Sequence, residues 1–457
     1  MADLERSHRP SADGLLVDLY QLTMGESYVR EGIAEREATF SLFFRTLPQA
    51  WGYALAAGLD DALRYLRELR FSEDGLAYLE GTGLFGETFL DRLRAFRFSG
   101  AVRAMPEGTP VFPSEPLLEL TAPLVEAQIA ETMVLNEIHL QTLIASKAAR
   151  SVEAARGATL VDFALRRAHG GEAGLKVARA SYLAGFDSTS NVLAGMCYGI
   201  PVAGTMAHSY IESFADETEA FRAFARAYPD QAILLVDTYE TVGGVHGAVV
   251  VGRELADAGH RLRGVRIDSG DLVELSRAAR SLLDEAGFED ATVFVSGGLD
   301  ETGIARLLAA GAPISGFGVG SKMGVSADAP FLDMAYKLVE IDGRPVLKLS
   351  EGKATLPGRK QVWRVLHDGV AAHDVLGLAD GNGEGEPLLR EVMRNGSPTS
   401  AESLQESRER ARRGRESLPE HLRTLEAGTY DVRVDTALHG LRNRVGREVS
   451  GYPGGRR

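Results

Sequence analysis

The chain has 457 residues, 44% of them hydrophobic and 25% charged, which is the composition of an ordinary globular protein of two or three domains. Its net charge of -14 argues against a general binder of nucleic acid or of membrane surfaces, and no apolar run approaches the roughly 20 residues that span a bilayer. The single cysteine, Cys197, excludes an internal disulfide and suits a reducing compartment. Because the charged N-terminus also lacks the apolar segment of a signal peptide, we expect a cytoplasmic protein.

The first section, residues 1–123, contains both helical and strand-like patterns. A helical pattern follows Asp18, a strand-like run covers 38–44, and further helical segments cover 58–70. Short strand-like runs separated by turns then follow, at 101–105, 109–112 and 117–120. The section is therefore predicted to be a small α+β domain.

The second section, residues 124–335, repeats one pattern, in which a short apolar run ends in a small or polar residue and a helical stretch follows. The runs are 159–162, 200–204, 232–237, 264–268, 292–296 and 314–318. Continuous apolar strands that alternate with helices are typical of a parallel sheet covered on both faces. Six such units favour an irregular (β/α) barrel-like domain, in which the reactive groups lie at the C-terminal ends of the strands.

The third section, residues 336–457, is a smaller C-terminal region. Strand-like runs at 336–341, 346–349 and 361–365 precede a Gly-rich connection and a charged helix at 403–416, and the tail 451–457 is expected to be disordered. Lys348, Lys353, Arg359 and Lys360 form a basic cluster in an acidic protein. This cluster is suited to a polyphosphate, and the alternative is a set of solvated side chains around a turn.

One strand end carries an arginine and an aspartate two positions apart, Arg266 and Asp268. Because alternate residues of a strand point to the same side, both are expected at the mouth of the barrel. A cation and a carboxylate there can hold a bound anion and stabilise a developing positive charge. Ser269 then opens a helix whose amides face the same region. The alternative is a structural ion pair followed by an ordinary helix cap.

Two glycine-containing loops follow the next two strands. One contains Gly297 and Gly298, and the other contains Gly318, Gly320 and Ser321. Glycines let backbone amides approach phosphate oxygens closely, and the serine adds a hydroxyl. Two such loops on successive late strands form the usual phosphate site of a barrel, although both are also compatible with ordinary tight turns.

Two further strand ends carry candidate groups. His208, three residues after Thr205, suits a general base, an anion ligand or a nucleophile toward phosphate, although a lone histidine is more often structural. Phe163 and Arg166 follow the first barrel strand. A flat anionic ring would stack on the phenyl group and pair with the guanidinium, while the alternative is a buried phenylalanine and a surface arginine.

Taken together, these motifs resemble the nicotinate phosphoribosyltransferase family. The stretches that carry the resemblance run in family order, at 18–24, 43–45, 163–167, 185–191, 204–209, 266–271, 318–321 and 348–351. The resemblance implies a reaction in which nicotinate and phosphoribosyl pyrophosphate give nicotinate mononucleotide and pyrophosphate, in NAD salvage. It further implies coupling to ATP hydrolysis, Mg²⁺ on the pyrophosphate, and a homodimer with shared active sites.

The resemblance also implies roles for individual residues. His208 matches the histidine that ATP phosphorylates, and Tyr20 matches an aromatic residue that stacks on the pyridine from the partner subunit. Thr205 and Arg266 match positions that contact nicotinate, and Phe163, Arg166 and Ser190 belong to the same pocket. The residues expected at phosphates are Gly318, Gly320, Ser321, Arg45 and Lys348, joined by Ser269, Gly297 and Gly298 through their positions at strand ends. Asp268 is expected to stabilise a cationic ribose. No metal ligand is assigned.

Three other functions compete with this interpretation. In the nicotinamide phosphoribosyltransferases, an aspartate near the equivalent of Ser190 accepts from the amide nitrogen, so the serine here favours a carboxylate substrate. The quinolinate phosphoribosyltransferases have a shorter chain and lack the motif around His208. A non-catalytic barrel that binds a phosphate ligand would need neither an acid nor a nucleophile at the strand ends.

Overall fold

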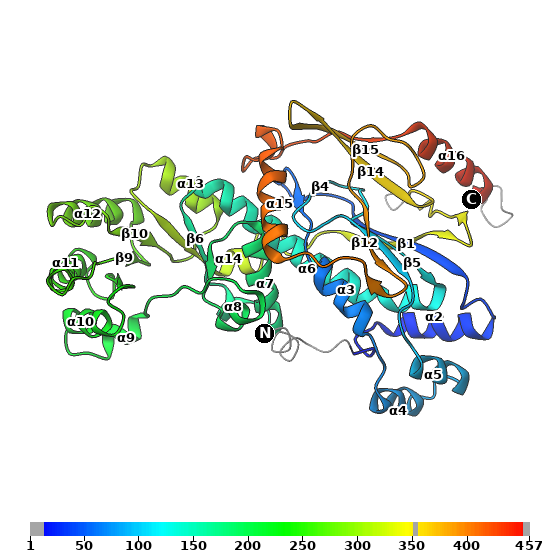
Figure 1. Cartoon of the computed structure of the whole chain (residues 1–457), viewed down its shortest axis with the longest axis horizontal. Helices are drawn as coiled ribbons and strands as arrows, with labels where there is room; N and C mark the ends of the chain where they lie inside the picture. Colours follow the sequence, from blue (N-terminus) through cyan, green and yellow to red (C-terminus); the bar gives the residue numbers. More distant parts are fainter. Residues whose placement is uncertain (1–12, 351–354, 451–457) are drawn as a thin grey trace. The chain divides into compact units, whose positions relative to one another are not determined.

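The structure is a computed structural model that describes residues 13–350 and 355–450. Its described residues form two compact units (Figure 1). The central unit comprises residues 147–330, and the flanking unit comprises 13–146 together with 331–450. The three sections expected from the sequence, with boundaries after 123 and 335, are thus arranged as two units.

The flanking unit is built on a seven-stranded sheet of order β13-β12-β1-β5-β3-β17-β18. Its strands are β1 (Glu37–Phe44), β3 (Ala101–Ala104), β5 (Leu118–Pro123), β12 (Met334–Ile341), β13 (Arg344–Pro345), β17 (Arg390–Arg394) and β18 (Ser397–Pro398). Strand β1 lies antiparallel between β5 and β12, and β3 pairs with β17. The first and third sections do not form separate domains, because their strands hydrogen-bond in this one sheet.

The other elements of the flanking unit agree in part with the sequence patterns. A second sheet, of order β16-β14-β15-β19, is accompanied by several helices. These elements are α2 (Leu19–Arg30), β2 (Ala54–Leu55), α3 (Leu59–Glu68), α4 (Glu73–Gly81), α5 (Glu87–Arg94), β4 (Pro110–Val111), β14 (Lys360–His367), β15 (Val370–Leu378), β16 (Glu386–Pro387), α15 (Leu404–Glu416), β19 (Val432–Val434) and α16 (Thr436–Ser450). The strand expected at 346–349 is absent: the hairpin partner of β12 ends at Pro345, although the Val346 amide still donates to the Val339 carbonyl at 2.9 Å.

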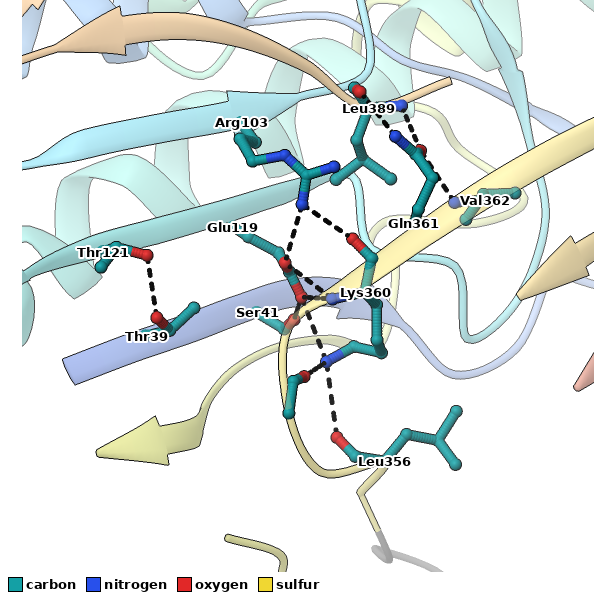
Figure 2. A network of polar contacts seen from close by, with 11 residues as sticks. Thr39, Ser41, Arg103, Glu119, Thr121, Leu356, Lys360, Gln361, Val362 and Leu389 are labelled. Atoms are coloured by element: carbon teal, nitrogen blue, oxygen red, sulfur yellow. Dashed lines mark hydrogen bonds and ion pairs between the residues drawn. The ribbon is translucent and has the colours of Figure 1, made fainter. Parts of the chain in front are cut away.

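A buried polar network ties the two segments of the flanking unit together (Figure 2). The Lys360 ammonium lies 3.1 Å from a carboxylate oxygen of Glu119, and their side chains are 4% and 2% exposed. The same carboxylate accepts from the Ser41 hydroxyl at 2.6 Å, and Arg103 lies 3.8 Å away. Lys360 therefore stabilises the fold and does not belong to an exposed basic cluster. Lys353 and the tail 451–457 lie outside the described residues.

The central unit contains a six-stranded parallel sheet of order β7-β6-β11-β10-β9-β8. Its elements are β6 (Thr159–Asp162), α7 (Gly171–Ala184), β7 (Ser188–Thr189), α8 (Val192–Tyr198), α9 (His208–Glu212), α10 (Glu217–Ala227), β8 (Ile233–Leu235), α11 (Thr241–Asp257), β9 (Gly264–Ile267), α12 (Leu272–Glu285), β10 (Thr292–Val295), α13 (Glu301–Ala309), β11 (Gly316–Val319) and α14 (Ser321–Gly324). The 32-residue helix α6 (Leu124–Ala155) precedes β6 and contributes residues to both units. This alternation confirms the expected α/β class with an irregular barrel-like centre.

The barrel of the central unit is incomplete. The run 200–204, expected as a full strand, forms only an isolated bridge between Thr189 and Val202, and the short β7 takes the place beside β6. Within the described residues, no strand pairing connects β7 with β8, so the sheet remains open there. Among the same residues, no helix combines the length and apolar character needed to cross a membrane.

Candidate active site

The C-terminal ends of four neighbouring strands of the central unit surround a cavity of about 210 Å³. The lining residues come from the ends of β9 and β11 and from the segments that follow β6, β9, β10 and β11: Phe163, Arg166, Arg167, Arg266, Asp268, Ser296, Gly297, Gly298, Gly318, Gly320 and Ser321. All but Arg167 and Ser296 were expected from the sequence to bind substrate or act in catalysis. Strand register explains the grouping, because parallel strands end at the same edge of the sheet.

Arg266 is the centre of the hydrogen-bond network in this cavity. Its Nε donates to the hydroxyl of Ser296 at 2.9 Å, and its Nη2 donates to Asp268 Oδ1 at 2.8 Å. Its Nη1 donates to the Thr205 hydroxyl at 3.1 Å and to the carbonyl of Met206 at 3.3 Å. The Arg266 side chain is 11% exposed, so these contacts fix a cation at the base of the cavity. Thr205 is therefore connected to the site through Arg266, and its expected contact with nicotinate stays a prediction.

Phe163 forms an aromatic wall beside this cation. The guanidinium carbon of Arg266 lies 5.2 Å from the centroid of the phenyl ring, within the range of a cation–π interaction. The ring occupies space that glycine leaves on β11, since a Cβ on Gly318 would lie 2.5 Å from a ring carbon. Gly318 was expected to let a phosphate approach the backbone. In the structure, the space left by its missing side chain is occupied by the ring of Phe163.

Asp268 is held as an anion. Burial alone would raise its pKa, but hydrogen bonds from Ser296 and Arg266 and the electrostatic influence of Arg266 and His208 bring the pKa below its ordinary value. Both side-chain hydrogen bonds end on Oδ1. In the described part of the chain, Oδ2 accepts no hydrogen bond and remains available to a ligand.

His208 lies at the start of α9, and Thr238 contacts its ring. The Nδ1 atom is 3.1 Å from the Thr238 hydroxyl, which leaves Nε2 without a hydrogen bond to any described residue. His208 is not among the residues that line the cavity, but its electrostatic influence helps to lower the pKa of Asp268. The ring is only partly buried, so it is accessible to a phosphate donor.

The remaining strand-end carboxylates have structural partners. Asp162 is 1% exposed and accepts from the Ala164 amide and the Thr189 hydroxyl; burial raises its pKa despite these bonds. Asp237 accepts from the backbone of Asp268 at 2.9 Å and from the Ser269 hydroxyl at 2.7 Å. Ser269 therefore braces the loop after β9 and does not line the cavity.

The other predicted site residues do not line this cavity. Ser190 is partly buried, and its amide donates to the Asp162 carbonyl. Tyr20, Arg45 and Lys348 belong to the flanking unit. Tyr20 is 48% exposed, and burial of part of the side chain together with the charge of Glu131 raises its pKa to about 12.

The two phosphate candidates of the flanking unit differ in their surroundings. Arg45 pairs with Asp333 at 2.8 Å, and its own side chain is 21% exposed. Lys348 is exposed and forms no ion pair with a residue that the structure describes. Arg45 therefore has to exchange or share its carboxylate partner in order to bind a phosphate, whereas Lys348 does not.

Sequence reasoning missed two residues that line the cavity. Arg167 follows Arg166 directly, and neither guanidinium forms an ion pair within the described residues. Ser296 directly follows β10 and was expected only as the last residue of the apolar run 292–296, yet it contacts both Arg266 and Asp268. The register of β9 and β10 explains the position of Ser296: Val295 pairs with Ile267, which brings Ser296 beside Asp268.

Comparison with known proteins identifies the family. Residues 15–139 match the N-terminal domain of nicotinate phosphoribosyltransferase, and residues 158–369 match the nicotinate phosphoribosyltransferase family. The nicotinate phosphoribosyltransferase pncB2 of Mycobacterium tuberculosis is 49% identical over 98% of this chain and 97% of its own. That of Bacillus subtilis is 44% identical over 80% of this chain and 75% of its own. The crystal structure of the human nicotinic acid phosphoribosyltransferase superposes with a TM-score of 0.82 at 32% identity, covering 94% of this chain and 99% of that chain. The chain therefore belongs to the nicotinate phosphoribosyltransferase family.

Proposed function

We propose that this protein joins nicotinate to the phosphoribosyl group of phosphoribosyl pyrophosphate, giving nicotinate mononucleotide and pyrophosphate. The observation that carries the proposal is the pairing of Arg266 and Asp268 in one cavity beside the ring of Phe163. The cation suits the carboxylate of the pyridine, the phenyl ring suits its flat face, and the carboxylate suits a ribose that becomes positively charged.

The lining of the cavity supports a preference for the acid over the amide. Arg266, Arg166 and Arg167 present guanidinium donors, and no carboxylate other than Asp268 lines the described cavity. A nicotinate carboxylate would accept charge-assisted hydrogen bonds from these groups. The –NH₂ group of nicotinamide would instead meet donors, and an unsatisfied buried polar group costs about 1–3 kcal/mol.

Asp268 acts on the ribose. Loss of pyrophosphate from C1 gives the sugar oxocarbenium character, and a preorganised carboxylate stabilises that charge without rearrangement of solvent. Because the pKa of Asp268 lies below its ordinary value, the group is ionised at neutral pH and needs no activation. The loops containing Gly297, Gly298, Gly320 and Ser321 offer backbone amides and a hydroxyl to the phosphates.

His208 couples the reaction to ATP hydrolysis by accepting a phosphoryl group. The contact of Nδ1 with Thr238 supports this role, because it orients the ring and leaves Nε2 as the nucleophilic atom. The family resemblance supports it further. Phosphorylation would add negative charge to a residue that influences Asp268 electrostatically, and so alter how the cavity binds the anionic substrate.

Magnesium enters this proposal with the substrate. No group of three or more His, Cys, Asp or Glu side chains suited to a metal ion occurs in the described residues, so we assign it no site on the protein and no step. Mg²⁺ commonly binds largely through the phosphates of its ligand. We also propose a cytoplasmic homodimer with shared active sites, in which the half-exposed Tyr20 of each subunit completes the pyridine pocket of the other.

One experiment tests the reaction and the coupling together. Purified protein is supplied with phosphoribosyl pyrophosphate and either nicotinate or nicotinamide, with and without γ-labelled ATP, beside the variant His208→Ala. We expect nicotinate to be preferred by orders of magnitude, and an acid-labile label on the wild type alone. Comparable use of the two rings contradicts the assignment of substrate, whereas equal labelling of the two proteins contradicts only the phosphohistidine.

A further inference from the structure

Ser296 closes a ring of hydrogen bonds between the two charged residues of the cavity. Its hydroxyl accepts from Arg266 Nε at 2.9 Å and donates to Asp268 Oδ1, while Arg266 Nη2 donates to the same Oδ1 at 2.8 Å. A serine hydroxyl has one proton and two lone pairs, so it serves both partners at once. Ser296 is 2% exposed and lines the cavity, so water does not compete freely for these bonds.

The backbone leaves Ser296 little freedom to make other contacts. The parallel register of β9 and β10 pairs Phe294 with Arg266 and Val295 with Ile267, and the Ser296 amide then donates to the Ile267 carbonyl at 3.0 Å. The Ser296 side chain also lies close to Gly318, where an added Cβ would be 3.1 Å from the serine Cβ. The hydroxyl is thus directed by three neighbouring strands.

We propose that Ser296 is a positioning residue for the phosphoribosyl transfer, whose hydroxyl fixes the orientation in which the Asp268 carboxylate meets the ribose. The torsion that turns a carboxylate about its Cβ–Cγ bond is broad, so a single hydrogen bond from Arg266 does not define it. Two donors on Oδ1 do define it, and they leave Oδ2 free of donors within the described residues. This inference rests on the role proposed for Asp268.

The hydroxyl also keeps the carboxylate ionised. Burial raises the pKa of Asp268, and the hydrogen bond from Ser296 is the first of the contacts that oppose it, ahead of those from Arg266 and His208. The other charged groups around Asp268 are Asp237, which accepts from its amide, and Arg166 and Arg167, which line the same cavity. All of these remain in a variant that lacks only the hydroxyl, so a difference from the wild type reports on the hydroxyl.

The experiment compares Ser296→Ala with the wild type between pH 5 and pH 8. We expect kcat to fall on the order of tenfold to a hundredfold, by more than KM for nicotinate rises, because displaced catalytic groups cost about that much. We also expect the ratio of variant kcat to wild-type kcat to decrease toward pH 5, since the pKa of Asp268 is higher without the hydroxyl. Ser276→Ala removes a fully buried hydroxyl elsewhere in the central unit and should leave this ratio flat.

Asp268→Asn and the double variant separate the possible outcomes. If Ser296 acts through Asp268, the double variant should be no slower than Asp268→Asn alone. Additive losses, or a loss in Ser296→Ala that is independent of pH, would reduce Ser296 to a structural residue and overturn the inference. Normal kcat in Ser296→Ala beside a slow Asp268→Asn overturns it as well and leaves the role of Asp268 intact. Normal kcat in Asp268→Asn removes that role itself.

Discussion

Replacing Lys360 with methionine should destabilise the flanking unit by about 3–5 kcal/mol, the usual cost of removing one partner from a buried ion pair. The Glu119 carboxylate, 2% exposed, would lose the ammonium at 3.1 Å. The ammonium also donates to the carbonyls of Gly358, at 2.7 Å, and Leu356, at 3.4 Å, and both would lose a donor. The Ser41 hydroxyl and Arg103 remain near the carboxylate, so the expected loss lies toward the lower end of that range.

The two tryptophans make the measurement specific to this unit. Trp51 and Trp363 are the only tryptophans of the chain, both belong to the flanking unit, and both are buried. Their fluorescence during urea unfolding therefore reports on this unit alone. The double variant with Glu119→Gln should recover part of the loss, because it removes the unpaired charge.

A surface ion pair provides the matched control for Lys360→Met. Arg390 and Glu386 lie 3.0 Å apart with side chains 55% and 58% exposed, so Arg390→Ala should cost at most about 1 kcal/mol. A free energy of unfolding for Lys360→Met within about 1 kcal/mol of the wild type would refute the reasoning. A loss that small is typical of a solvated ion pair, and it would mean that water or a rearrangement of the protein compensates the Glu119 charge.

Three further predictions concern the site and its support. Ser190→Asp should narrow or reverse the preference for nicotinate, by adding an acceptor and repelling the carboxylate; an unchanged ratio of kcat/KM for the two rings would exclude Ser190 from the pocket. Gly318→Ala should displace the ring of Phe163, at an overpacking cost of about 1–3 kcal/mol, and raise KM for nicotinate more than KM for phosphoribosyl pyrophosphate. Burial and the neighbouring charge of Asp374 raise the pKa of Glu115, so its protonated form contributes stability that is lost as pH rises through the folded-state pKa. Glu115→Gln should therefore flatten the decline in the free energy of unfolding toward alkaline pH, and an identical decline in both proteins would contradict this sign.

Strand ends in the central unit could be predicted because the information is local. Arg266 and Asp268 share a face through the two-residue period of a strand, and the apolar runs marked where four of the cavity-lining strands end. The sequence predicted a full strand at 200–204, which was wrong. This apolar stretch contains Pro201, which cannot donate to a sheet, and it forms only one bridge.

What could not be predicted depends on pairing between distant segments. Residue 318 has to be a glycine because the Phe163 ring packs against it. This contact follows from the pairing of β6 with β11, which are not consecutive in the chain. The burial of Lys360 follows from a partner 241 positions away, so a single-sequence pattern could only describe it as basic. Ser296 was overlooked because a serine after a strand is typical of a turn, and only its neighbours give it a further role.

The flanking sheet imposes an order on biosynthesis. Strand β1 pairs with β12, with Phe44 opposite Met334, so the ribosome must complete the whole central unit before β1 can receive this neighbour. Until then, one edge of a largely buried strand offers unpaired backbone groups to other chains. The contiguous segment 147–330 can fold in the meantime, since its sheet needs no residue from outside it. A nascent chain halted after the central unit would thus carry a finished barrel-like sheet joined to an incomplete one, a form that chaperones and proteases would recognise.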